Sequence, residues 1–301
     1  SPTAGTIDVL GRRFSAAGAT VGPEFRVNAT TSHSQQQSSV ARTGTGEFVV
    51  AWSSGQANNS YAIFAQRFDA AGAPAGPEFL VSAPANAATR PSVAVSGSGS
   101  FVIAWHEPVA LDNSNTEVFA QRYSASGAPL GLTFHVNSYT TGLQHYPRVA
   151  SNTAGDFIVV WQSDGQDGSG KGVYAQRYAA VGSPLGAEFK VNGVTTGDQA
   201  LGGVSSDPAG NLVVVWSGPG AINTEIFARR YCQGLAGDAD GNGQISVADV
   251  FWLINALFAG GPAPVHGSDV NGDGKVDVAD VFFLINYLFA GGPGPACPAT
   301  I

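Results

Sequence analysis

The sequence predicts a mainly β protein, with a four-bladed β-propeller-like domain over residues 1–231 and a small α-helical module over 232–301. Three observations carry this prediction. Four short sequence markers recur in one order with a period of about 55 residues. The chain holds 40 glycines and 17 prolines but only 12% charged residues, which is typical of short strands joined by tight turns. Two acidic loops, each followed by an apolar run, occupy the last seventy residues.

The first marker is a segment that ends in an arginine and an aromatic residue. It reads GRRF at 11–14, AQRF at 65–68, AQRY at 120–123, AQRY at 175–178 and ARRY at 228–231. Its last residues are spaced 54, 55, 55 and 53 positions apart. In the second copy Phe64, Gln66 and Phe68 would share one face, so we expect a strand near a sheet edge.

The other three markers also predict strands. An F-x-V motif begins at Phe25, Phe79, Phe134 and Phe189, a short run contains Val40, Val93, Val149 and Val204, and an apolar run ends at Trp52, Trp105, Trp161 and Trp216. The tryptophan runs are apolar on both faces, as in strands buried on both sides. Gly- and Pro-rich segments such as 69–78 predict the connecting turns. Four strands per period without a helix predict a propeller blade.

A β-solenoid is the alternative fold, because stacked repeats would share this periodicity. The repeats resemble the Q-R-Y-D-A-A-G and F-V-V-x-W-Q-S repeats of large secreted bacterial surface proteins, over residues 1–231. The equivalent segments at 7–14 and 225–231 would compete for one position in a closed ring of four blades, so one strand is surplus. The arginine of the first marker recurs in every copy, and we expect it to serve the repeat as a structural ladder.

Residues 238–249 and 269–280 both fit the spacing of a twelve-residue calcium loop, with oxygen-bearing side chains at positions 1, 3, 5, 9 and 12 and glycine at position 6. Residues 233–301 hold seven Asp and one Lys, so −6 of the chain's net charge of −8 lies here and favours a cation ligand. We therefore predict two calcium ions. The predicted ligands are Asp238, Asp240, Asn242, Ser246, Asp249 and the Gln244 carbonyl in the first loop, and Asp269, Asn271, Asp273, Asp277, Asp280 and the Lys275 carbonyl in the second.

Each loop is followed by one apolar helix, and no helix precedes it. This duplicated loop-then-helix pattern resembles the dockerin domain over about 235–292. The resemblance implies two antiparallel helices in a near-symmetric, calcium-dependent unit that docks on a cohesin partner. The helices are apolar nearly all round, and an exposed apolar patch marks a protein interface. We expect that interface to contain Val247, Phe251, Trp252, Ile254, Val278, Phe282, Phe283, Ile285 and Tyr287.

Two cysteines, Cys232 and Cys297, bracket this module, and we expect a disulfide between them. Closing a loop of this length stabilises by roughly 4 kcal/mol in the chain-entropy model. A disulfide indicates an oxidising compartment, so we expect an extracellular or cell-surface bacterial protein. The chain lacks a membrane-spanning apolar run, and it lacks a basic stripe for nucleic acid.

The five histidines are scattered, and the pair His106–Glu107 is not repeated in other copies, so we expect no catalytic residues and no enzyme activity. The sequence favours a non-catalytic structural protein that assembles with copies of itself, as a fibre or surface layer, through the calcium-ordered module. The surplus strand, the apolar helices and the lack of a tether after Tyr231 favour that reading. The alternative is a propeller that binds glycan or protein and is anchored to a cohesin scaffold by its dockerin.

Overall fold

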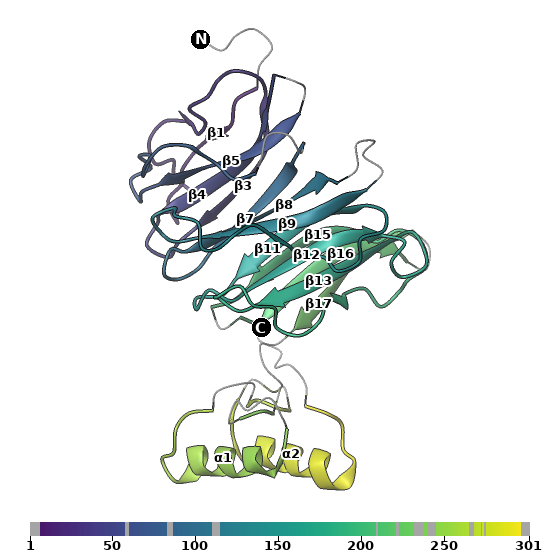
Figure 1. Cartoon of the computed structure of the whole chain (residues 1–301). Helices are drawn as coiled ribbons and strands as arrows, with labels where there is room; N and C mark the ends of the chain where they lie inside the picture. Colours follow the sequence, from purple (N-terminus) through teal and green to yellow (C-terminus); the bar gives the residue numbers. More distant parts are fainter. Residues whose placement is uncertain are drawn as a thin grey trace. The chain divides into compact units, whose positions relative to one another are not determined.

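The computed structural model describes most of the chain: residues 7–57, 60–82, 87–109, 115–208, 210–220, 223–231, 237–239, 245–264, 268–271, 273 and 275–295. The chain divides into two compact units, residues 1–208 with 214–228, and residues 209–213 with 229–301. The first is β-rich, and the second contains the two helices (Figure 1). The domain boundary expected between 231 and 232 stays a prediction.

Three copies of the repeat each form a four-stranded antiparallel sheet. The first sheet holds β3 (Gln35–Arg42), β4 (Phe48–Gly55), β5 (Tyr61–Phe68) and β6 (Phe79–Leu80). The second holds β7 (Thr89–Val95), β8 (Phe101–Pro108), β9 (Thr116–Tyr123) and β10 (Phe134–His135). The third holds β11 (Gln144–Ser151), β12 (Phe157–Asp164), β13 (Lys171–Tyr178) and β14 (Phe189–Lys190). All four markers therefore form strands in the described part of these copies, although the F-x-V strands are only two residues long.

The two ends of the repeat region form smaller sheets. β1 (Leu10–Gly11) pairs with β2 (Phe25–Arg26), and β15 (Ala200–Ser206), β16 (Leu212–Pro219) and β17 (Thr224–Tyr231) form a three-stranded sheet. The expected count of four blades is therefore not confirmed. The reason is that the repeat region begins and ends with a strand of the first marker, so its two end sheets hold two and three strands. β1 and β17 are equivalent strands; β1 pairs with β2, and β17 is the last strand of the sheet β15-β16-β17.

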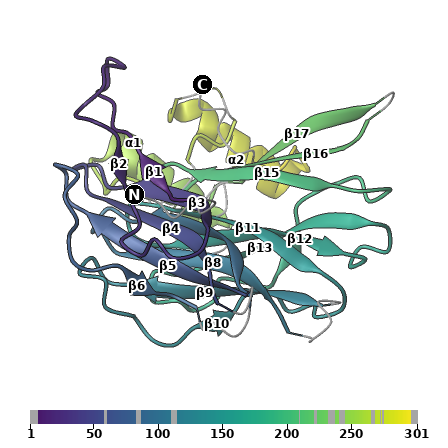
Figure 2. The same ribbon diagram turned by 90° about the horizontal axis from the view of Figure 1, so that it is seen from above.

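The sheets follow one another in chain order, as Figure 2 shows from above. Their first strands, β3, β7, β11 and β15, are successive neighbours. Each sheet is antiparallel and built from consecutive strands, as in a propeller blade, whereas a solenoid would pair equivalent strands of successive repeats. The tryptophan strands lie in the middle of the sheets and are almost completely buried: Trp52, Trp105 and Trp161 are at most 1% exposed.

The recurring arginines join each sheet to the turn of the next. Arg67 Nη1 donates to the Ala125 carbonyl at 2.7 Å, and Arg122 donates to the Val181 carbonyl at 2.5 Å. Each turn accepts the guanidinium closely because it holds a glycine with positive φ. A Cβ at Gly127 would lie 2.8 Å from Arg67 Nε. These contacts support the structural role expected for the repeated arginine.

The C-terminal module contains α1 (Val247–Phe258) and α2 (Val278–Ala290), which pack against each other. Ser246 caps α1 and Asp277 caps α2, each in a capping box with the acid three residues later. The two halves are related by 31 positions in sequence and share their buried residues. The core contains Ala239, Val250, Leu253, Val270, Val281 and Leu284. No helix among the described residues is long and apolar enough to span a membrane.

Candidate functional site

The second acidic loop is closed by Asp280, at position 12. Its Oδ1 accepts hydrogen bonds from the backbone N–H groups of Val270 (2.8 Å) and Asn271 (3.2 Å). Its Oδ2 accepts from the N–H of Asp277 at 2.9 Å. One fully buried carboxylate therefore ties the start of the loop to its end and to the N-terminus of α2.

The side chains at positions 1, 3 and 5 turn back toward the loop's own backbone. The N–H of Asp273 donates to Asp269 Oδ1 at 3.1 Å and to Asn271 Oδ1 at 2.9 Å. Asp273 Oδ1 in turn accepts from the N–H of Lys275 at 2.9 Å. Asp277 Oδ1 accepts from the Ala279 N–H at 2.7 Å. The predicted oxygens of this loop therefore lie within one short, tightly folded segment.

The first loop repeats this closure where it is described. Asp249 is fully buried and its Oδ2 accepts from the N–H of Ser246 at 2.7 Å, as Asp280 does for Asp277. Asp238, at position 1, is 2% exposed, and its counterpart Asp269 is 6% exposed. The predicted ligands Asp240, Asn242 and Gln244 lie outside the described residues.

The donor set fits a hard divalent cation. Buried carboxylates are costly unless their charge is compensated, and residues 233–301 hold seven Asp against one Lys. Carboxylate, amide, hydroxyl and carbonyl oxygens are the ligands that calcium prefers. Within the part of the chain that the structure describes, no three His, Cys, Asp or Glu side chains form a metal cluster by themselves.

The two helices expose matching rows of apolar side chains. Phe251 and Phe282 are both 66% exposed, and their neighbours along each helix form the same row. We call these rows the docking face, which comprises Val247, Phe251, Ile254 and Phe258 on α1 and Val278, Phe282, Ile285 and Phe289 on α2.

The docking face differs from the sequence-predicted interface in two respects. Trp252 and Phe283 were expected there, but both pack against the module's core, while Tyr287 is exposed as expected. Phe258 and Phe289, which the prediction omitted, are 67% and 70% exposed. They fall at the helical spacing i+7 from Phe251 and Phe282, so periodicity alone could have found them.

The predicted disulfide falls on Cys232 and Cys297, which lie outside the described residues. It therefore stays a prediction.

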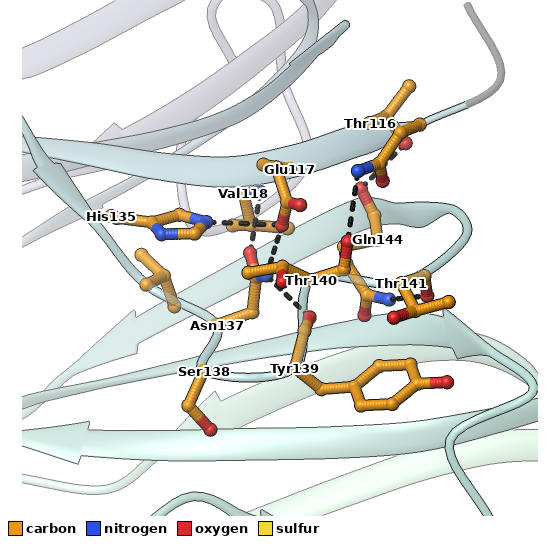
Figure 3. A network of polar contacts seen from close by, with 12 residues as sticks. Thr116, Glu117, Val118, His135, Asn137, Ser138, Tyr139, Thr140, Thr141 and Gln144 are labelled. Carbon is orange, nitrogen blue, oxygen red and sulfur yellow. Dashed lines mark hydrogen bonds and ion pairs between the residues drawn. The ribbon is translucent and has the colours of Figure 1, made fainter. Parts of the chain in front are cut away.

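A buried polar network joins β9 to the segment after β10 (Figure 3). Glu117 is 3% exposed and contacts His135 Nε2 at 3.1 Å and the Asn137 side-chain amide. Asn137 Oδ1 accepts from the Val118 N–H at 2.8 Å. The same asparagine tie occurs in two other copies, at Asn28 and Asn192, so this network chiefly serves the repeat.

The pair His106–Glu107 lies on β8, next to Glu117 in register on β9. Burial, with smaller contributions from His145 and Arg90, lowers the pKa of His106 to about 3. Its Nε2 contacts Thr89 Oγ1 at 3.2 Å, and Glu107 Oε2 accepts from Trp105 Nε1 at 2.9 Å. His106 is therefore neutral at physiological pH.

Comparison with known proteins identifies the C-terminal module. Residues 236–289 match the family model described as the dockerin type I domain. No curated protein matches the sequence.

Solved structures resemble the chain at low sequence identity. An α-L-arabinofuranosidase of Fusarium graminearum in complex with an iminosugar inhibitor is 15% identical, with a TM-score of 0.50 over 76% of this chain and 71% of that one. An α-L-arabinanase of Penicillium chrysogenum complexed with arabinobiose is 14% identical, with a TM-score of 0.49 over 74% and 72%. An endo-arabinase from Bacteroides thetaiotaomicron is 14% identical, with a TM-score of 0.39 over 62% and 71%.

These findings overturn two predictions. The β-rich domain has a fold that glycoside hydrolases also use, which contradicts the expectation of a protein without enzyme activity. The expected self-assembling fibre or surface layer is also wrong. The dockerin match points to a cohesin as the partner, in place of further copies of this chain. Both errors arose because the sequence markers are the residues that every copy of the repeat needs for its framework. A site built from residues that are not repeated leaves no recurring motif. Residues 236–289 are a dockerin type I domain that follows a β-rich, propeller-like domain.

Proposed function

We propose that this protein is an extracellular, cohesin-anchored module whose β-rich domain acts on a glycan. One observation carries the anchoring half of the proposal: two copies of a loop and helix, 31 residues apart, have the same buried acids and the same exposed apolar row. The β-rich domain supports the second half through its fold, which resembles that of an α-L-arabinofuranosidase.

Two calcium ions would hold the dockerin together. The first would be bound by Asp238, Asp240, Asn242, Ser246, Asp249 and the Gln244 carbonyl, and the second by Asp269, Asn271, Asp273, Asp277, Asp280 and the Lys275 carbonyl. The metal would supply the positive charge that the buried acids require. Asp249 and Asp280 each bond the backbone before their helix, so calcium bound there also stabilises the helix start.

The docking face would bind the cohesin. Its eight apolar side chains are exposed in the isolated chain, and burying a Phe side chain contributes about 1.5–3 kcal/mol. The two rows are equally exposed, with 66% exposure at Phe251 and at Phe282. This equality supports binding through the row of either helix.

The β-rich domain would be the functional cargo. We propose that its successive sheets are the blades of a propeller of four repeats, with β3, β7, β11 and β15 lining the centre. We also propose the Cys232–Cys297 disulfide as a covalent tie around the dockerin. Mass spectrometry of unreduced protein tests it, and two alkylatable thiols would exclude it.

Surface plasmon resonance with immobilised, purified cohesin domains tests the anchoring. We expect binding in calcium and none after chelation, and at least a tenfold loss for Asp269→Asn combined with Asp280→Asn. Asp198→Asn, an exposed acid paired with Lys171 in the β-rich domain, is the matched control and should bind normally. Calcium-independent binding, or binding to no cohesin, would contradict the proposal.

Assays on polysaccharides test the cargo. We expect the protein to be retarded in affinity gels that contain plant cell-wall polysaccharides, or to release reducing sugar from these polysaccharides. The result should be the same with the dockerin deleted or present. A chain that neither binds nor cleaves arabinan, xylan or pectin would leave the anchor but remove the glycan from the proposal.

A further inference from the structure

Three inner strands carry the same unusual backbone feature. Gln37, Arg90 and Tyr146 have φ values of 55°, 54° and 54°, in the left-handed region that residues other than glycine rarely adopt. Each lies where the register shifts, on β3, β7 and β11 respectively. Such conformations cost energy, persist only where the surroundings enforce them, and cluster at functional sites. The repeat therefore builds one bulge three times and turns one side chain out of each inner strand.

The copies share this backbone but not the side chains. Where the repeat needs a residue for its own structure, the copies keep it, as with Arg67 and Arg122. At the bulge they carry glutamine, arginine and tyrosine instead. The fold therefore requires this backbone conformation but no particular side chain, which leaves the position available for contacts with a ligand.

The position two residues after the bulge also differs between the copies. Ser39 Oγ accepts from the Val93 N–H at 3.2 Å, and Ser92 Oγ accepts from the Val149 N–H at 3.1 Å, so these serines tie neighbouring inner strands together. The third copy has Arg148 at this position. A guanidinium has no acceptor and cannot make that tie. Arg148 Nη1 instead donates to the Pro147 carbonyl at 3.0 Å, so the third copy lacks the serine tie.

These residues surround a hollow of about 340 Å³, which we call the inner-strand hollow. That volume falls within the range of small-molecule sites. The lining contains hydroxyl, amide and guanidinium groups and no carboxylate: Gln37, Ser38, Ser39, Arg90, Pro91, Ser92 and Arg148.

The two arginines give the hollow a positive charge. Neither belongs to an ion pair among the described residues, where Asp164 lies 3.3 Å from His145 Nε2 and Asp198 pairs with Lys171. Arg148 is half-buried, and burial together with the charge of Arg90 lowers its pKa. Two like charges at one partly desolvated site are stabilised by an anion.

The arginine at the bulge is held in place before any ligand arrives. Its guanidinium lies 4.4 Å from the ring centroid of Tyr146, which His145 stacks against at 4.4 Å. Its backbone N–H donates to Gln37 Oε1 at 3.1 Å and to Ser53 Oγ at 3.2 Å. This preorganisation reduces the entropy lost on binding.

We propose that the inner-strand hollow binds the carboxylate of a uronic-acid residue in a glycan. The planar forks of Arg90 and Arg148 match a carboxylate, and the serine hydroxyls and the Gln37 amide match the hydroxyls of a sugar ring. This inference rests on the proposed function, because it names the ligand class of the same β-rich domain.

Calorimetry on the full, calcium-loaded chain tests the inference. The probes are tetragalacturonic acid, neutral arabinotetraose, a sulfated chondroitin tetrasaccharide and inorganic phosphate. We expect tetragalacturonic acid to bind at least tenfold more tightly than the other three, and its binding to weaken as salt rises.

Two variants taken from the repeat itself remove the arginines without foreseeable damage to the fold. Arg90→Gln copies the residue that the first copy holds at the same φ, and Arg148→Ser copies the ladder serine. Each should weaken tetragalacturonic acid binding at least tenfold with an unchanged melting temperature. Arg12→Gln, an exposed arginine outside the hollow, controls for net charge and should bind normally.

The outcomes separate this inference from the proposed function. Unchanged affinity in both variants overturns the hollow as the site. Binding of arabinotetraose without tetragalacturonic acid overturns the acidic ligand but keeps the glycan function. Equal binding of phosphate or the sulfated probe shows a general anion site and overturns the uronate. Binding of no saccharide overturns both.

Discussion

The β-rich domain and the dockerin both use repetition, but they are held together by different forces. The β-rich domain repeats every 55 residues or so, and each copy buries its own apolar strands: Trp52, Trp105 and Trp161 are at most 1% exposed. The dockerin repeats every 31 residues, and its two copies bury six core residues between them while their docking face stays in water. Four acids, Asp238, Asp249, Asp269 and Asp280, are buried beside that core. The first domain is stabilised mainly by burial, and we infer that the second depends on metal.

The copies also differ in what they keep constant. In the β-rich domain the framework is constant and the inner bulge varies, which gives one asymmetric hollow. In the dockerin all four exposed positions of the docking face are identical between the copies: Val247 matches Val278, Phe251 matches Phe282, Ile254 matches Ile285, and Phe258 matches Phe289. Constancy that packing does not require points to a surface used in two equivalent ways.

Chelation should give the largest difference between the two domains. Removing calcium with EGTA takes away the cation that we propose beside the buried acids Asp238, Asp249, Asp269 and Asp280. We therefore expect the helical module to unfold while the β-rich domain stays folded. Circular dichroism should show loss of the helical signal at 222 nm, and calorimetry should show one transition lost and one kept.

Magnesium added after chelation is the control, because it demands a small octahedral site and should restore the helices poorly. Helices that survive EGTA, or two transitions that fall together, would show that the domains do not differ in this way.

A core truncation should act in the opposite sense. Trp105→Ala removes a 1% exposed indole and the partner of Glu107, and we expect the β-rich domain to lose about 3–5 kcal/mol of unfolding free energy. Calcium affinity should stay within twofold. Denaturant unfolding and calcium titration measure the two effects.

Leu253→Ala, which truncates a fully buried residue of α1, is the matched variant in the other domain. It should lower calcium affinity and spare the β-rich transition. A change in both domains from either variant would show that their stabilities are coupled.

The framework of both domains could be predicted from sequence, because every copy repeats the same physical requirement. The tryptophan runs became central strands, and the apolar runs after the two acidic loops became α1 and α2. The inner-strand hollow could not be predicted, because Arg90 and Arg148 lie in different copies and become neighbours only when β7 and β11 pack together. The sequence also cannot show that Trp252 and Phe283 face the core, since both helices are apolar nearly all round.

Acid should destabilise the β-rich domain through the protonation of a buried histidine, His106. His106 is 9% exposed, and burial lowers its pKa to about 3 from 6.5. The neutral form is favoured in the folded state, so its contribution is complete above pH 6.5 and is lost as the pH falls toward 3. We expect a loss on the order of 2–3 kcal/mol by pH 4. Urea unfolding between pH 7 and pH 4, monitored on the β-rich transition, measures it.

His106→Gln should remove most of that pH dependence, whereas His33→Gln, at an exposed histidine, should leave it intact. Equal slopes in all three proteins would assign the acid sensitivity to other groups.

Substitutions in the docking face should have the smallest effect on stability and a large effect on cohesin binding. Phe251 and Phe282 are 66% exposed and make little of the dockerin core, so Phe251→Ala combined with Phe282→Ala should change unfolding free energy by less than about 0.5 kcal/mol. Trp252→Ala should lower the unfolding free energy more, because that side chain packs against the core.

The effects on cohesin binding should follow the reverse order. If the two rows are equivalent, either single Phe variant should retain most of the affinity, since the other helix still presents an intact row, and only the double variant should lose it. Plasmon resonance on the single and double variants measures this. A full loss from one single variant would show that the duplicated face is used in only one orientation, and unchanged binding by the double variant would place the cohesin contact elsewhere.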